Sequence, residues 1–194
     1  ILALRARAGN RRLRSTPSEP GATLRGMTQV TPVPVPRRLA WPGPSTWAAI
    51  AAGAMLTTAL PPVRGTAVLA PVALALLFHL LREAPRPGRL GWAFGLAHQG
   101  TLLYWMFFLD PAKSIPTRAL VPLQAAATIL YCALFALLFG WAAGRVRRRL
   151  GPGAALAAMP ALWVAVELLR LVGELGFPWC LAGSAWIDTP LMPL

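Results

Sequence analysis

The stretch 167-ELLRLVGELGFPWCLAG-183 decides how the chain is interpreted, because an apolar helix ends within it. As far as Val172 it has the composition of a membrane helix, although Glu167 and Arg170 carry charge. The segment 173–179, GELGFPW, then combines two glycines, which permit unusual backbone angles, with a proline, which cannot continue a helix. The sequence therefore predicts that the chain leaves the helix, turns, and lies with its aromatic side chains along a membrane headgroup zone.

The two charged residues of this helix need a physical reason. A charged side chain at the bilayer centre costs about 2.5–3.5 kcal/mol on insertion scales. Glu167 and Arg170 are three residues apart and share one helix face, and Glu167 lies about 8 Å from the helix end at Val172. Two interpretations stay open: a mutually neutralised pair that reaches toward water, or a polar contact inside a bundle that shapes a lipid or protein site. The residues that follow favour the second.

Composition indicates a membrane protein. The 194 residues are 56% hydrophobic and 13% charged, whereas soluble domains have roughly 25% charged residues, and the mean hydropathy is +0.56. A net charge of +13 is compatible with nucleic-acid binding. The arginines, however, lie in a tail and in short loops between apolar runs, which is the pattern that orients membrane proteins. We therefore expect an all-α, polytopic membrane helix bundle and no nucleic-acid partner.

The chain divides into a tail and a bundle. Residues 1–44 are basic and proline-rich, so we expect a disordered cytoplasmic tail; the chain opens with Ile1, and the true start is either Ile1 or Met27. Residues 45–194 are expected to form about five transmembrane helices, each crossing needing about 20 apolar residues. The five apolar segments are 47–63, 65–81, 90–109, 119–146 and 153–172.

The loops between these segments predict an orientation. The connections REAPRPGR and GRVRRR are rich in arginine, whereas PPVRG and DPAKSIPTR are less basic. Because positive loops stay on the cytoplasmic side, the alternation predicts a multi-pass protein with a cytoplasmic N-terminus. Five crossings then place the segment 173–179 on the outer side.

Two glycine pairs have the spacing that allows helices to approach closely in lipid. GWAFG contains Gly91 and Gly95, and GWAAG contains Gly140 and Gly144. Such small-xxx-small pairs are enriched at helix interfaces. The alternative, that these glycines are simply tolerated in membrane helices, is equally compatible with the sequence.

The cysteines and histidines do not indicate a catalytic or metal site. Cys132 lies in an apolar run and is expected to pack as a small hydrophobe. Cys180 has no histidine near it in sequence to generate a reactive thiolate, so it is also expected to be a packing residue. His98 and Gln99 are expected to be hydrogen-bonded within the bundle, since no metal-ligand spacing accompanies them. We expect no metal and no cofactor.

The C-terminal part LWVAVELLRLVGELGFPWCLAGSAWIDTPLMPL resembles the apolipoprotein N-acyltransferase family of bacterial inner membranes. The matching features are the Trp163–Glu167–Arg170 run, Gly176-Phe177-Pro178-Trp179, Gly183-Ser184 and Pro190-Leu191. The earlier GWAFGLAHQGTLLYW resembles the family's third membrane segment, with its Tyr-Trp end, and ALPPV resembles the end of its first. The likeness spans about residues 47–194.

The resemblance implies a fold and a reaction. Members of the family carry a nitrilase-like domain with a Glu-Lys-Cys triad on their membrane helices. The cysteine takes an acyl chain from a phospholipid as a thioester and passes it to the α-amino group of the lipidated N-terminal cysteine of an apolipoprotein. No triad residue carries over to this sequence, so no catalytic residue is assigned. The chain is expected to be the N-terminal membrane part of such an enzyme and to be inactive alone.

The resemblance and the polar residues together give the site candidates and the partners. The predicted substrate- or lipid-binding residues are Glu167, Arg170, Phe177, Pro178, Trp179, Tyr104 and Trp105. The implied partners are a phospholipid acyl donor, a bacterial apolipoprotein acceptor and membrane lipids.

Two other functions compete with this interpretation. A small non-enzymatic membrane scaffold or partner-binding protein would use the same helices, although the abrupt end in DTPLMPL favours a truncated enzyme. A transporter would need an aqueous pathway lined by several polar residues, and too few are present.

Overall fold

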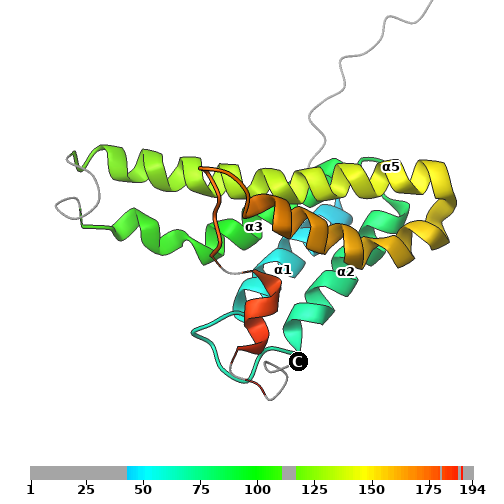
Figure 1. Ribbon diagram of the computed structural model, residues 1–194, viewed down its shortest axis with the longest axis horizontal. Coiled ribbons are helices and arrows are strands. Elements are labelled where there is room, and N and C mark those ends of the chain that lie inside the picture. The colour runs from blue at the N-terminus through cyan, green and yellow to red at the C-terminus, as the bar shows by residue number, and fades with distance from the viewer. Residues whose placement is uncertain (1–42, 111–116, 180, 188, 190–194) are drawn as a thin grey trace, which may run out of the picture. The chain divides into compact units, whose positions relative to one another are not determined.

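The regular elements of the described residues are all helical, as the sequence predicts (Figure 1). The computed structural model describes residues 43–110, 117–179, 181–187 and 189. In chain order the elements are α1 (Pro44–Thr58), α2 (Leu69–Glu83), α3 (Pro87–Leu102), the 3₁₀ helix η1 (Tyr104–Phe108), α5 (Leu120–Arg170) and the 3₁₀ helix η2 (Ala182–Trp186). The predicted tail, residues 1–44, lies outside the described residues except for its last two positions.

Prolines set where two helices begin. Pro44 and Pro87 occupy the first turns of α1 and α3, where a missing N–H costs nothing because that group has no intrahelical partner. Both helices therefore start three residues before the apolar segments predicted at 47 and 90. The third predicted segment ends differently as well, because α3 tightens after Leu102 into η1.

The helix α5 consists of two arms joined at Gly151. This glycine has φ 84° and ψ 169°, a conformation that glycine adopts without a steric penalty. Pro152 follows and starts the second arm. The chain reverses here, and the second arm, 152–170, runs back beside the first, 120–150 (Figure 1). The two arms correspond to the fourth and fifth predicted segments.

Aromatic side chains join the two arms to the other helices. The Trp163 ring meets Phe139 of the first arm at a centroid distance of 5.2 Å, and Phe94 of α3 at 5.9 Å, both edge to face. Phe78 of α2 lies 5.6 Å from Phe139. Such pairs contribute about 0.5–1.5 kcal/mol each beyond the area they bury. The bundle core is thus centred on Trp163.

The glycines of both pairs lie at the contact between α3 and α5: Gly91 faces Gly140, Gly95 faces Ala133 and Ala136, and Gly144 faces Pro87. A Cβ atom added to Gly91 would collide with the carbonyl group of Ala136 and lie 3.2 Å from the Cα atom of Gly140. A Cβ at Gly95 would lie 3.2 Å from the Cα of Ala133. Of the two interpretations left open for these glycines, the structure therefore supports close helix approach, because the absence of side chains lets the two backbones come together.

One arginine of α5 caps the end of α2. Arg147 donates from Nη1 to the carbonyl oxygens of Leu81 (3.2 Å) and Arg82 (2.9 Å). Its Nη2 atom donates to the carbonyl oxygen of Ala84 (2.8 Å). The last carbonyl groups of a helix have no intrahelical partner, and a cation there also interacts favourably with the helix dipole. Arg147 thus ties the α2–α3 connection to α5.

Among the described residues, α5 is the one helix that is long and apolar enough to cross a membrane. The helices α1 and α2 have 15 residues each and α3 has 16, so they extend about 22–24 Å. The hydrocarbon core of a bilayer is about 30 Å thick. The count of five crossings therefore stays a prediction.

The glycine contact can be tested with one substitution at two positions of α3. Gly91→Ala should lower the free energy of unfolding by about 1–3 kcal/mol, because the added methyl group has no space. Gly100→Ala is the control: nothing lies within 4 Å of an added Cβ there, and alanine is the better helix former by about 0.5–1 kcal/mol. Thermal unfolding of the purified chain in detergent measures both. Equal melting temperatures for the two variants would contradict the packing.

Candidate functional site

The helix α5 ends in a tight turn within the quoted stretch. The amide of Phe177 donates to the carbonyl oxygen of Arg170 (2.9 Å), and the amide of Gly176 donates to the carbonyl oxygen of Gly173 (3.0 Å). Gly173 has φ 88°, which favours glycine over every other residue. The predicted turn is thus present, although the helix ends at Arg170, two residues earlier than predicted.

The segment after the turn is attached to the first arm of α5. The Tyr131 hydroxyl donates to the carbonyl oxygen of Leu175 (3.0 Å). The half-buried ring of Phe177 packs against a small apolar cluster formed by Leu103, Met106, Ala125 and Cys132. Phe177 is therefore an anchor for the turn, and the chain immediately before and after it is held against the bundle.

The two charged residues of the helix end bind the backbone of the segment that follows. Arg170, with 5% of its surface exposed, donates from Nη2 to the carbonyl oxygen of Trp179 (3.3 Å). The Oε1 atom of Glu167 accepts a hydrogen bond from the amide of Ala182 (2.8 Å). These are polar contacts inside the bundle, as in the second of the two interpretations. A role of the two residues in lipid binding stays a prediction.

Two of the predicted aromatic residues meet at the surface. The rings of Trp105 and Trp179 lie 5.9 Å apart with an interplanar angle of 35°. They are 38% and 56% exposed, and the neighbouring Tyr104 is 62% exposed. The structure therefore brings η1 and the GFPW segment together. Pro178, between Phe177 and Trp179, is exposed.

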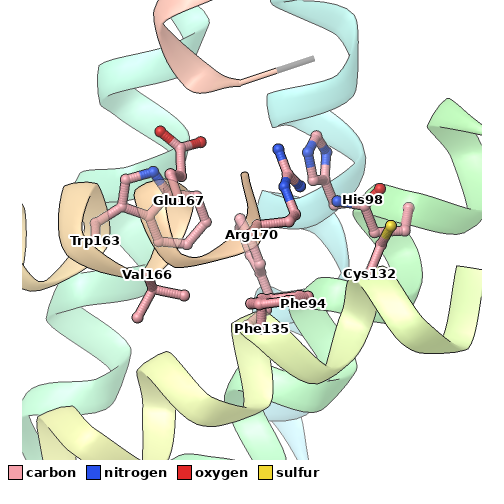
Figure 2. Close-up of a pocket in the computed structure, with 10 residues that line it drawn as sticks. Phe94, His98, Cys132, Phe135, Trp163, Val166, Glu167 and Arg170 are labelled. Carbon is pink, nitrogen blue, oxygen red and sulfur yellow. The ribbon is translucent and has the colours of Figure 1, made fainter. Parts of the chain in front are cut away.

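A small cavity with both apolar and polar side chains in its wall lies behind the helix end. Here the Arg170 guanidinium points toward His98, and the Glu167 carboxylate lies beside the Trp163 indole (Figure 2). The volume of the cavity is about 20 Å³, enough for one water molecule and far too small for an acyl chain. The Oε1 atom of Gln99 is buried, lines this cavity and has no hydrogen-bond partner among the described residues. A single water molecule fits this site, and a lipid does not.

His98 connects α3 to α1. Its Nδ1 atom lies 2.9 Å from the hydroxyl of Thr57, which also donates to the His98 carbonyl oxygen (3.0 Å). Only 5% of the His98 surface is exposed. The prediction of hydrogen bonding within the bundle is confirmed for His98. It is not confirmed for Gln99, whose Oε1 atom has no partner among the described residues. The described residues contain no group of three side chains able to hold a metal ion.

The two cysteines have different outcomes. Cys132 is 1% exposed and packs in the apolar cluster beneath Phe177, so its prediction as a packing residue is confirmed. Cys180 lies outside the described residues.

Sequence reasoning missed two residues that hold the turn. Tyr131 lies in an apolar run, and Ala182 contributes only its amide, so neither has a side-chain pattern that indicates this role. The residues of the cavity wall, in contrast, can be recognised from their spacing in the sequence. Trp163, Glu167 and Arg170 are spaced four and three residues apart, which places all three on one helix face.

Residues 52–194 match the family model of the apolipoprotein N-acyltransferase N-terminal domain. The chain belongs to the apolipoprotein N-acyltransferase family. This confirms the resemblance noted in the sequence, and the matched range includes all seven predicted site residues.

Relatives named apolipoprotein N-acyltransferase show the same relationship. The protein of Azotobacter vinelandii is 39% identical over 163 residues, covering 81% of this chain and 30% of the relative. That of Pseudomonas aeruginosa is 35% identical over 163 residues, covering 81% and 31%. That of Photobacterium profundum is 33% identical over 149 residues, covering 75% and 28%. The chain thus spans less than a third of the length of these curated relatives.

The turn can be tested with matched glycine substitutions. Gly173→Ala should destabilise the chain by about 1–2 kcal/mol, because a positive φ is unfavourable for a residue with a Cβ atom. Gly183→Ala is the control, since nothing lies within 4 Å of an added Cβ at that position. The measurement is thermal unfolding in detergent. If Gly173→Ala melts at the wild-type temperature, the left-handed turn is not present.

Proposed function

We propose that the chain is the membrane-embedded N-terminal part of an apolipoprotein N-acyltransferase of the bacterial inner membrane. The enzyme transfers an acyl chain from a phospholipid to the amino group of the N-terminal diacylglyceryl-cysteine of an apolipoprotein. The observation that carries the proposal is the family match over residues 52–194. A non-enzymatic scaffold is not favoured, because the relatives bear the name of an enzyme.

In this proposal the end of α5 forms part of the lipid-facing side of the site. Trp105 and Trp179 present exposed rings in contact with each other, and tryptophan concentrates at headgroup depth in membranes, where the acyl ester of a phospholipid lies. Glu167 and Arg170 are positioning residues, since their side chains hold the backbone around Trp179 and Ala182. The tryptophan pair touches the lipid, and the charged pair keeps Trp179 in place.

The acyl transfer itself is assigned to a part of the enzyme that this chain does not supply. Covalent acyl transfer needs a nucleophile activated by a neighbouring base. Cys132, the cysteine among the described residues, is buried in an apolar cluster. The chain spans less than a third of the length of its relatives, so the proposal places the nucleophile in the remaining part of the enzyme and expects no transfer by the 194-residue chain alone.

The proposed topology has five crossings and a cytoplasmic N-terminus. Two observations support it. The arginine-rich α2–α3 connection lies against the arginine-rich end of the first arm of α5 through Arg147, so positive charge gathers at one end of the bundle. The second arm returns from that end toward the turn at Gly173. The positive end then faces the cytoplasm and the turn faces the outer side.

Cysteine labelling in intact cells tests this topology. In a Cys180→Ala background, Gly183→Cys should react with a membrane-impermeant maleimide, whereas Leu150→Cys, at an exposed position near the arginine-rich end, should react only after permeabilisation. Buried Cys132 should remain unlabelled in both. The reverse labelling pattern would refute the orientation.

Activity is tested by joining all 194 residues of this chain to the remaining C-terminal part of the Azotobacter vinelandii relative. Trp179→Ala and Glu167→Gln in this fusion should insert normally, yet lower the rate of acyl transfer to a diacylated lipopeptide by about tenfold, which corresponds to about 1.4 kcal/mol. Trp47→Ala is the matched control, because this tryptophan is equally exposed, at 57%, but lies on α1. Its transfer rate should stay at the wild-type value.

Three results would count against the proposal. Wild-type turnover per molecule for both Trp179→Ala and Glu167→Gln would show that the segment 167–183 is only the end of a helix and has no role in acyl transfer. Loss of membrane protein with unchanged specific activity would make Glu167 purely structural. Transfer by the 194-residue chain alone, lost in Cys180→Ala, would show that Cys180 is the nucleophile.

A further inference from the structure

Two arginine-rich segments that are far apart in sequence meet at one end of the bundle. The guanidinium of Arg147 binds the carbonyl oxygens of Leu81, Arg82 and Ala84. Close packing of Pro87 against Gly140 and Gly144 holds the same connection against α5. The α2–α3 connection and the end of the first arm of α5 therefore form one continuous surface.

This surface carries a high density of positive charge. We call it the basic end; its exposed arginines are Arg82, Arg86, Arg89, Arg145, Arg148 and Arg149. The acidic residue beside them is Glu83, whose carboxylate lies 3.8 Å from the Arg82 guanidinium. Arg147 is occupied by the α2 carbonyl groups, whereas the six exposed side chains face outward. A surface of this kind attracts anions.

An apolar side chain lies directly beside the arginines. Trp141 is 54% exposed and precedes Arg145 and Arg149 by four and eight residues, so the three side chains lie along one face of α5. The rest of the first arm before Trp141, residues 120–140, contains no charged residue and belongs to the described helix that is long and apolar enough to cross a membrane. Along this face the surface is first apolar, then carries a tryptophan, and then carries guanidinium groups. A bilayer changes in the same order, from acyl chains through the interface to the phosphates.

We propose that the basic end binds the phosphate groups of anionic phospholipids. The planar guanidinium group donates two parallel hydrogen bonds to a phosphate, and clustered arginines next to a membrane helix are typical of anionic-lipid recognition. Nucleic acid fits less well, because the charged surface ends at Trp141 and an apolar arm. The inference rests on the membrane position proposed above, but it concerns the end of the bundle away from the proposed acyl-transfer site.

Native mass spectrometry of the purified 194-residue chain in detergent tests the inference, with phosphatidylglycerol and phosphatidylcholine of identical acyl chains as probes. The wild type should retain phosphatidylglycerol at least tenfold more strongly. Arg145→Gln should weaken this binding about fivefold and Arg145→Gln/Arg149→Gln about 25-fold, since each arginine near an anionic surface contributes roughly a factor of five at low ionic strength.

The matched control is Arg118→Gln, an exposed arginine just before the opposite end of the same arm. It removes the same charge and should leave phosphatidylglycerol binding within twofold of wild type. An equal loss in Arg118→Gln would mean that net charge alone governs binding and would overturn the inference. So would the absence of a preference over phosphatidylcholine, or tighter binding of a single-stranded RNA 20-mer at physiological ionic strength. Lipid retention at the basic end without acyl transfer by the fusion would leave this inference standing and reject the proposed function.

Discussion

The buried guanidinium of Arg170 is the constraint on which the turn after α5 depends. Removing a charged group from water costs several kcal/mol even after relaxation, unless hydrogen bonds replace the lost hydration. Arg170 sits in an apolar helix end with 5% of its surface exposed and donates to the carbonyl oxygen of Trp179. The reversal of the chain after α5 brings that carbonyl group back to the guanidinium. Gly173 and the hydrogen bond from Phe177 to the Arg170 carbonyl oxygen accomplish the reversal.

The same reversal connects the helix end to the surface where we place the lipid. Glu167 holds the amide of Ala182, and Tyr131 holds the carbonyl oxygen of Leu175. The segment is thus attached at several points, with the ring of Trp179 left exposed against Trp105. Burying Glu167 and Arg170 in an apolar environment costs free energy, and their hydrogen bonds hold the segment that places Trp179 against Trp105.

Much of this architecture follows from residue types at characteristic spacings. The five apolar segments predict the three helices and the two arms of α5, with ends that differ by up to seven residues, as at α3, which ends at Leu102 and not at 109. The glycine pairs at 91/95 and 140/144 indicate that helices can approach closely, but their spacing does not say which helices meet. The helix break at Gly-Phe-Pro-Trp is likewise readable, because glycine and proline act through their own backbone restrictions.

Contacts made by backbone groups could not be predicted in the same way. Ala182 contributes an amide and Ala84 a carbonyl group, and neither side chain marks the residue as a partner of Glu167 or Arg147. The choice between a mutually neutralised Glu167–Arg170 pair and separate contacts to the backbone depends on where the chain goes after the turn. Helical spacing predicts that Glu167 and Arg170 share one face of the helix, but it does not predict which groups they bind.

The central claim, that buried charge holds the turn in place, is tested most directly by hydrogen–deuterium exchange of the purified chain in detergent, comparing wild type with Arg170→Met. The account predicts that amides of residues 173–183 exchange at least tenfold faster in the variant, because local opening loses about 1.4 kcal/mol or more, while α1 keeps its protection. Unchanged protection of residues 173–183, or an equal loss of protection in α1, would contradict it.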